Sequence, residues 1–221
     1  MIPAMLLLLS GVVSLGALAA TSPVAPSSDL CGNTIVADLK LDHDLVCAGN
    51  GITVGAHGIE IDLNGHSITG PSRGSFTRGI TVIGRVDVEI EGPGTVTNFR
   101  TGILIMNSVN VEVEKVTVAG NGARPFGDGD GIRIVSSTDV EVEKSDIRDN
   151  GNDGVEITLS TDVELEKNRI LGNGNGISLR GAGGEIEKNK IMKNACGVKG
   201  STVGSELEKN YFKDNDVDFC A

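Results

Sequence analysis

The stretch VEVEKSDIRDN at Val140–Asn150 occurs in two further copies with small changes, VEVEKVTVAGN at Val111–Asn121 and VELEKNRILGN at Val163–Asn173. Each copy alternates aliphatic and acidic residues, continues with a lysine and ends on an asparagine. Alternation with a period of two is typical of a β-strand that buries one face. A unit that recurs along the chain indicates a repeat architecture, so the period of the repeat decides the fold.

Two residue types measure this period. The asparagines that close the units are separated by 23, 29, 23, 21 and 21 residues, and the lysines by 29, 23, 21 and 21 residues, so both series contain one long step. Short strands, corner glycines and the lack of a helical period predict an all-β, single-stranded parallel β-helix of about eight coils of 21–23 residues. The asparagines are Asn98, Asn121, Asn150, Asn173, Asn194 and Asn215, and the lysines are Lys115, Lys144, Lys167, Lys188 and Lys209.

Stacked coils place equivalent residues in columns about 4.8 Å apart. In VELE, Val163 and Leu165 then face the core, whereas Glu164 and Glu166 face outward. An outward glutamate column repels itself, and we expect the adjacent lysine column to offset that repulsion. This column is Glu114, Glu143, Glu166, Glu187 and Glu208. We expect the corner asparagines to hydrogen-bond to the coils above and below, and asparagine tolerates left-handed backbone geometry.

The N-terminus has the pattern of an export signal. Residues 1–28 carry no charged side chain, include the apolar run LLLLSGVVSL, and fit a small-residue cleavage site at Ala17–Ala19. We predict a signal peptide at 1–20, a linker at 21–29 and a β-helix domain at 30–221. Because the apolar run is short for a membrane span, we expect a secreted, periplasmic or cell-surface protein with no stable membrane insertion after cleavage.

The cysteines indicate disulfides, and the net charge limits the kinds of partner that the protein can bind. Four cysteines in an exported chain indicate disulfides. Three connectivities exist, and we favour Cys31–Cys47 with Cys196–Cys220, because each pair lies near one open end of the solenoid. The net charge of −11 excludes nucleic acid as a partner. Cations, basic proteins and neutral glycans stay open.

The repeat units resemble a known superfamily. GDGIRIVSSTDVEVEKSDIRDN at 129–150 and NDGVEITLSTDVELEKNRILGN at 152–173 resemble the β-helix repeats of the pectin-lyase-like superfamily, in its carbohydrate-binding and sugar-hydrolysis type of domain. LDHDLVCAGNGITVGAHGIEIDLNGHSITG at 41–70 resembles the first coils of secreted prokaryotic β-helix proteins. The resemblance covers roughly residues 31–220 and implies a right-handed solenoid with three sheets. Since that superfamily contains lyases, hydrolases, epimerases and inert scaffolds, it leaves the reaction open.

The one long step adds about six residues in GARPFGDGDG at 122–131, and insertions in repeat arrays are often functional. Asp130 and Asp153 precede strands of consecutive coils, so we expect them to lie about 5 Å apart. Such a pair suits a retaining glycosidase or a calcium site. The DGI stretch resembles the strand starts that carry catalytic aspartates in polygalacturonase-like hydrolases, which implies Asp130 and Asp153 as catalytic acids. Lyases of this fold imply Arg133 as the base.

Further residues complete the predicted site. The expected ligand-binding residues are Arg124, Phe126, Asp128 and Glu156, and the expected calcium ligands are Asp128, Asp130 and Asp153. The hydrolase pattern also needs a downstream histidine, but His43, His57 and His66 all lie upstream. Aspartate before glycine is also ordinary turn chemistry, so a purely structural role stays open.

Two functions remain. One is a non-catalytic scaffold that binds an extracellular or cell-envelope polysaccharide or another surface partner. The other is a polysaccharide lyase or glycoside hydrolase that uses Asp130 and Asp153. The sequence leaves open whether the protein is an enzyme and how many copies associate.

Overall fold

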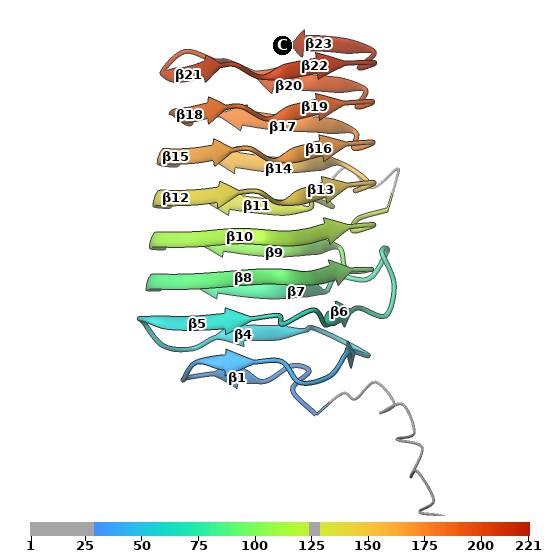
Figure 1. Cartoon of the computed structure of the whole chain (residues 1–221), viewed down its shortest axis with the longest axis vertical. Coiled ribbons are helices and arrows are strands. Elements are labelled where there is room, and N and C mark those ends of the chain that lie inside the picture. The colour runs from blue at the N-terminus through green and yellow to red at the C-terminus, as the bar shows by residue number, and fades with distance from the viewer. Residues whose placement is uncertain (1–28, 124–128) are drawn as a thin grey trace, which may run out of the picture.

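The protein is a right-handed parallel β-helix. The computed structural model describes residues 29–123 and 129–221, which stack as eight coils along the long axis of the molecule (Figure 1). Within these residues, no helix is long and apolar enough to cross a membrane. The predicted signal peptide and all of the predicted linker except residue 29 lie outside the described residues.

Each coil contributes strands to three faces, and equivalent strands of successive coils pair in parallel. The first face contains β1 (Thr34–Ile35), β4 (Ile52–Val54), β7 (Arg78–Ile83), β9 (Thr101–Met106), β11 (Ile132–Val135), β14 (Asp153–Thr158), β17 (Asn175–Arg180), β20 (Cys196–Gly200) and β23 (Val217–Cys220). The second contains β2 (Leu39–Lys40), β5 (Ile59–Asp62), β8 (Val86–Thr97), β10 (Val109–Ala119), β12 (Thr138–Glu143), β15 (Thr161–Glu166), β18 (Gly184–Glu187) and β21 (Ser205–Glu208).

The third face contains β3 (Leu45–Val46), β6 (Ser67–Thr69), β13 (Asp146–Arg148), β16 (Arg169–Leu171), β19 (Lys190–Met192) and β22 (Tyr211–Lys213). Both β8 and β10 continue from the second face through the corner into the third. The second and third faces therefore form one hydrogen-bonded sheet in the middle coils, and the three faces belong to two sheets.

The core consists of aliphatic columns. Val111 aligns with Val140 and then Val163, and all three side chains are buried. Because alternate residues point inward, the pattern read from VELE is confirmed for the second face. Burying each such side chain stabilises the fold by about 1.5–3 kcal/mol.

The ends of the solenoid carry the two disulfides. Cys31 is bonded to Cys47 in the first coil, and Cys196 is bonded to Cys220 across the last coils. This is the pairing expected from their positions. Each bond links segments at an end of the stack, where strands lack a neighbouring coil.

A column of asparagines, here called the amide ladder, joins the coils at the corner after the third face. It comprises Asn121, Asn150, Asn173, Asn194 and Asn215. At each step the backbone N–H of one asparagine donates to Oδ1 of the asparagine one coil later, at 2.9–3.0 Å. Asn150 Nδ2 also donates to the Val118 carbonyl of the preceding coil at 3.1 Å. The first four side chains are at most 2% exposed, so the ladder satisfies backbone groups that water does not reach.

The structure corrects the sequence prediction at this corner for Asn98 and shows which residues take the left-handed backbone. The residue that aligns with Asn121 is Phe99, whose N–H donates to Asn121 Oδ1 at 3.1 Å, and not Asn98. Left-handed geometry falls on the preceding residue, at Asn98 (φ 66°), Gly120 (66°) and Asp149 (56°). The ladder asparagines are therefore selected for hydrogen bonding and not for a left-handed backbone.

Lysines bridge the outward glutamates of successive coils, as expected. Lys188 Nζ lies 2.7 Å from Glu166 Oε1 and 2.7 Å from Glu187 Oε1. Lys144 joins Glu114 and Glu143 in the same way. Hydrogen bonds from Lys167 and Lys188 lower the pKa of Glu166 to about 2. This bridged glutamate row is Glu91, Glu114, Glu143, Glu166, Glu187 and Glu208.

The amide ladder predicts a large effect of Asn150→Ala. The substitution removes the acceptor of the buried Asn121 N–H and the donor to the Val118 carbonyl. A buried group left without its partner costs about 1–3 kcal/mol. We expect urea unfolding to show a loss of that size, whereas Asn33→Ala, at an exposed amide, should change the unfolding midpoint little.

The bridged row predicts acid sensitivity. The pKa of Glu166 is lower in the folded state than its usual 4.5, so its stabilising contribution is present above pH 4.5 and is lost as pH falls toward 2. The fall in urea midpoint over that range should be smaller in Glu166→Gln than in the parent. In Glu164→Gln the fall should not shrink, because the pKa of Glu164 is raised by burial and by neighbouring glutamates. Equal acid profiles for all three proteins would contradict the bridging.

Candidate functional site

The predicted pair of aspartates meets at the start of the first face. Asp130 lies just before β11, and Asp153 is the first residue of β14, whose register aligns Arg133 with Glu156. Asp130, Asp153 and Glu156 each have one carboxylate oxygen that lies within 4.8 Å of those of the other two. We call these three residues the acid pocket.

The two aspartates are fully buried and only half satisfied. Both are 0% exposed. Asp130 Oδ1 accepts hydrogen bonds from Asn152 Nδ2 at 2.9 Å and from the Asp153 N–H at 3.2 Å, and Asp153 Oδ1 accepts one from Asn175 Nδ2 at 2.5 Å. Neither Oδ2 has a hydrogen-bond partner in the described part of the chain. Buried polar atoms without partners are rare and point to something that binds them.

Burial also changes the acidity of the pocket. It raises the pKa of Asp130 to about 7, and the nearby charges of Asp153 and Glu156 add to the shift. The pKa of Asp153 is raised as well, mainly by burial, although the hydrogen bond from Asn175 opposes the rise. Two adjacent carboxylates that are shielded from water cannot both stay ionised without a large cost in free energy.

Glu156 is held by cations on both sides. Arg133 Nε lies 3.2 Å from Glu156 Oε2, Arg180 Nε lies 3.7 Å from Oε1, and Thr158 Oγ1 donates to Oε1 at 3.0 Å. Arg133, the predicted catalytic base, is thus engaged in an ion pair. Glu156, a predicted ligand-binding residue, is only 4% exposed. It lies buried between the two arginines.

The outcome for the predicted residues is mixed. The structure brings Asp130, Asp153, Arg133 and Glu156 together. Arg124, Phe126 and Asp128 lie outside the described residues. Sequence reasoning missed Asn152, Asn175 and Arg180, although Asn175 aligns with Asp153 and Arg180 with Thr158 in the next coil. Extending the columns by one coil would have found the last two.

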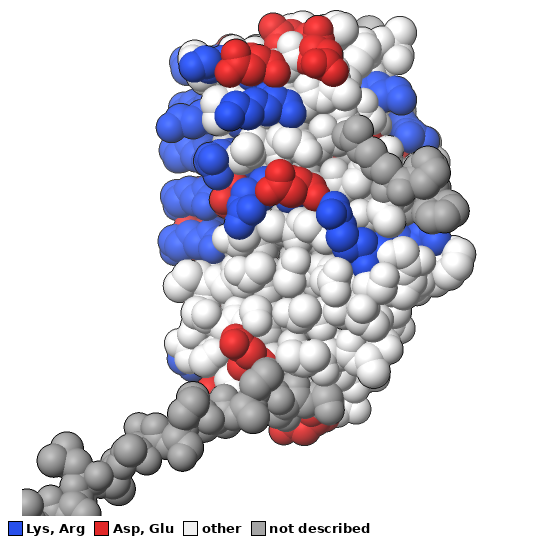
Figure 2. All heavy atoms as spheres, turned by 90° about the vertical axis from the view of Figure 1, so that its right-hand side faces the viewer, with Lys and Arg blue, Asp and Glu red and all other residues white. Residues whose placement is uncertain are grey.

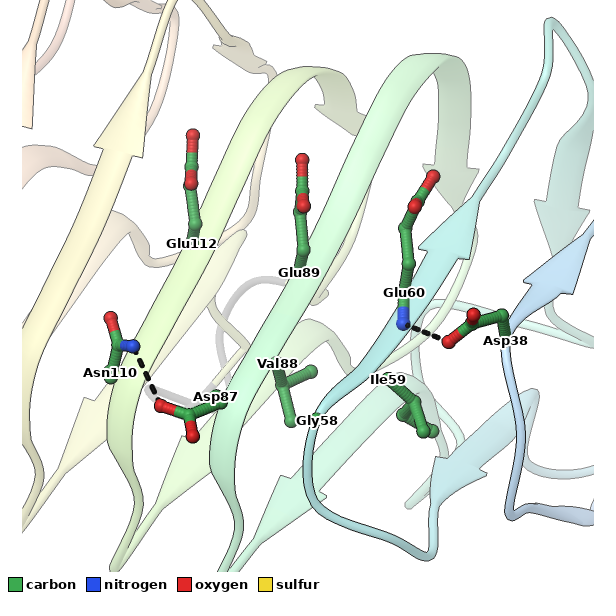
Figure 3. A pocket seen from close by; sticks show the side chains of 9 residues that line it. All are labelled: Asp38, Gly58, Ile59, Glu60, Asp87, Val88, Glu89, Asn110 and Glu112. Atoms are coloured by element: carbon green, nitrogen blue, oxygen red, sulfur yellow. Dashed lines mark hydrogen bonds between the residues drawn. The ribbon is translucent and has the colours of Figure 1, made fainter.

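A second glutamate row runs beside the bridged row, and no ion pair between described residues joins a lysine to it. This open glutamate row is Glu60, Glu89, Glu112, Glu141, Glu164, Glu185 and Glu206. Figure 3 shows Glu60, Glu89 and Glu112 pointing the same way from successive strands, beside Asp38 and a hydrogen-bonded pair, Asn110 and Asp87. Burial raises the pKa of Glu89, Glu141 and Glu164, and their neighbours raise it further. These side chains reach water, so the row is a solvated acidic surface.

A basic and aromatic surface lies on the first face, near the acid pocket. We call Phe76, Arg78, Arg100 and Arg133 the arginine face; they line a hollow of about 410 Å³ outside β7, β9 and β11. Phe76 is 85% exposed, and the Arg100 guanidinium lies 4.1 Å from its ring centroid. Sequence reasoning missed this surface, because its members share no motif.

Charge is also unevenly distributed around the solenoid. Figure 2 views the side where the third-face strands end, and lysine and arginine side chains stack there along one edge of the C-terminal coils. The N-terminal half of that view is mostly uncharged. A chain with a net charge of −11 therefore presents distinct basic and acidic surfaces.

Comparisons with known proteins identify a family. The family model described as "Periplasmic copper-binding protein (NosD)" matches residues 31–220. No curated protein matches. The periplasmic location in that description agrees with the two disulfides, which persist outside the cytoplasm.

Several solved structures are similar to this chain, and one of them superposes well enough to support the fold. The T265N mutant of the periplasmic alginate epimerase AlgG superposes with a TM-score of 0.63 at 16% identity, covering 77% of this chain and 45% of the epimerase. Pectate lyase Pel9A has a TM-score of 0.45 at 16% identity, covering 86% of this chain and 68% of that one. The alginate lyase from Paenibacillus sp. str. FPU-7 has a TM-score of 0.47 at 14% identity, covering 84% and 99%. This chain thus spans less than half of the epimerase.

The described residues do not fit copper. Copper sites favour imidazole and sulfur ligands. The four cysteines are in disulfides, and every described cluster of three or more metal-binding side chains contains carboxylates alone. His43 and His66 pair with aspartates, and His57 Nδ1 accepts the Val86 N–H. We therefore derive no chemistry through copper.

The clamp around Glu156 predicts a double-mutant result. Arg133→Met leaves a buried carboxylate with a weaker partner, so we expect a loss of about 1–3 kcal/mol in urea unfolding. Arg133→Met with Glu156→Gln should recover most of that loss, because the buried charge is then absent. Arg169→Met is the control: it breaks a more exposed pair with Asp146 and should cost about 0.5 kcal/mol or less. An additive double mutant would contradict the clamp.

Proposed function

The chain belongs to the family of periplasmic copper-binding proteins (NosD), and from this premise we propose that it is a non-catalytic scaffold outside the cytoplasm whose first face binds a polysaccharide of the cell envelope or its surroundings. The observation that carries the proposal is the 0% exposure of Asp130 and Asp153. A general acid or nucleophile has to come within hydrogen-bond reach of the bond it cleaves, and a polymer chain cannot enter a closed pocket.

The rest of the acid pocket supports the same proposal. Glu156 and Arg133 are occupied with each other, so neither is available as an acid or base. Asn152 and Asn175 fix one oxygen of each aspartate from neighbouring coils, as a structural element would require. A bound cation in the pocket is compatible with this role, and calcium is the candidate.

The arginine face is the surface best suited to the polysaccharide. Its exposed ring offers an apolar platform for a sugar, and the guanidinium groups of its arginines match the geometry of carboxylates. Arg78, Arg100 and Arg133 line one open hollow, and the charge of Arg133 is partly offset by its ion pair with Glu156. A polysaccharide that carries carboxylates fits this charge better than a neutral one.

The alternative is a lyase or glycoside hydrolase that uses Asp130 and Asp153. The raised pKa of Asp130, about 7, favours it, because a carboxyl group that keeps its proton near neutral pH can act as a general acid. Structural burial produces the same shift, and the closed pocket gives a substrate no access. The scaffold is therefore the preferred function.

Binding to the full chain tests the scaffold. We expect immobilised protein to retain a polyuronate more strongly than a neutral glucan, with binding that weakens as salt rises. Arg78→Gln with Arg100→Gln should weaken polyuronate binding about ten-fold or more. The matched control, Arg169→Gln with Lys190→Gln, removes the same charge from the third face and should bind like the parent.

Activity is measured in the same samples. The scaffold predicts no new reducing ends and no unsaturated uronate product after prolonged incubation. Turnover that Asp130→Asn abolishes would instead establish the enzyme. Equal retention of polyuronate by both double mutants would remove the arginine face as the binding surface.

A further inference from the structure

The acid pocket has an electrostatic imbalance that the described residues do not resolve. Arg133 and Arg180 both form their ion pairs with Glu156. Among the described residues, no ion pair reaches Asp130 or Asp153, and one oxygen of each aspartate has no partner. Two fully buried carboxylates in this state cost free energy unless a positive charge joins them.

We propose that the acid pocket is a structural site for a hard divalent cation, with calcium as the ion that its donors fit best. The unpartnered Oδ2 atoms of Asp130 and Asp153 would be the primary ligands, and Glu156 would supply a third oxygen. The site lies between two consecutive coils, so the ion would tie them together beside the one long step in the repeat.

The donor chemistry selects the class of ion. Carboxylate oxygens suit calcium, magnesium and manganese, whereas copper favours imidazole and sulfur. The proposed ion therefore differs from copper, the metal that the family description names. Calcium–oxygen distances of about 2.3–2.6 Å place opposite ligands about 4.6–5.2 Å apart, and one oxygen from each of the three carboxylates lies within 4.8 Å of the other two.

The burial of the site favours calcium over magnesium as its ion. Magnesium releases its waters reluctantly and usually keeps several of them. The aspartates are 0% exposed and Glu156 is 4% exposed, so a hydrated ion fits poorly. Calcium accepts irregular geometry and carboxylates that bind through one or both oxygens.

The rival occupant is a proton. A protonated Asp130 would donate to a neighbouring carboxylate and remove one charge without a metal. The two occupants differ in their response to calcium at constant pH, because a proton alone gives no dependence on calcium concentration.

Calcium binding to the full chain tests the site. The protein is stripped with a chelator and titrated with calcium chloride at fixed pH near 7.5, by calorimetry and thermal denaturation. We expect one ion per chain and a Tm that rises about 5–10 °C when calcium exceeds Kd about 100-fold. Asp153→Asn and Asp130→Asn, tested separately, should each weaken calcium binding at least about 100-fold.

The matched control is Glu141→Gln with Glu164→Gln, which removes two charges from the open glutamate row and should bind calcium like the parent. Circular dichroism of each variant shows whether the β-helix is intact. Either aspartate variant alone is sufficient if the other fails to fold.

Three results would overturn the site: no heat and no Tm shift at millimolar calcium, calcium binding that survives in both folded aspartate variants, or copper binding that is tighter than calcium binding and lost in Asp153→Asn. Polysaccharide retention is measured in a separate assay with the variants of the arginine face. Loss of the cation site and loss of the scaffold function are therefore distinguishable.

Discussion

The amide ladder is the interaction on which the rest of the structure depends. A solenoid that turns three corners in every coil buries backbone N–H and C=O groups at those corners, where no strand pairs with them. Each ladder asparagine accepts an N–H from one neighbouring coil and donates to a carbonyl there, at 2.9–3.1 Å for Asn150. At another corner serine hydroxyls accept such N–H groups, and the Ser137 N–H donates to Ser160 Oγ of the next coil. Side chains thus replace the missing ladder hydrogen bonds, and the spacing of the coils follows.

Fixed coil spacing has an electrostatic consequence on the outside. Residues of one type recur at each level, so like charges stack about 4.8 Å apart. In the bridged glutamate row, Lys115, Lys144 and Lys188 each lie between the carboxylates of two successive coils. The open glutamate row beside it remains unneutralised and is tolerated because water screens it. Repetition therefore creates charged surfaces as a by-product of the fold, and such surfaces alone do not indicate a ligand.

The acid pocket differs from those rows because water does not screen it. Its charges are buried, and the neighbouring Arg133 and Arg180 form their ion pairs with Glu156. Two of its oxygens have no partner in the described residues. The arginine face lies beside it and shares Arg133. A cation in the pocket and a polysaccharide on the face would thus both lie near Arg133, so this residue would link the structural site to the binding surface.

The sequence by itself determined the coil period, the inward and outward columns, the lysine offset and the positions of the disulfides, because each depends only on spacing along the chain. It also aligned Asp130 with Asp153, one coil apart. The spacing of asparagines misplaced the ladder at Asn98, because the left-handed residue and the hydrogen-bonding residue are adjacent and both favour asparagine.

Only the tertiary structure decided that the two aspartates are closed off, that Glu156 is clamped by Arg180 from the next coil, and that Phe76 stacks on Arg100. Exposure, orphaned oxygens and ion pairs depend on which side chains from different coils cover a given atom. That depends on the three-dimensional packing of side chains, which a one-dimensional period does not contain.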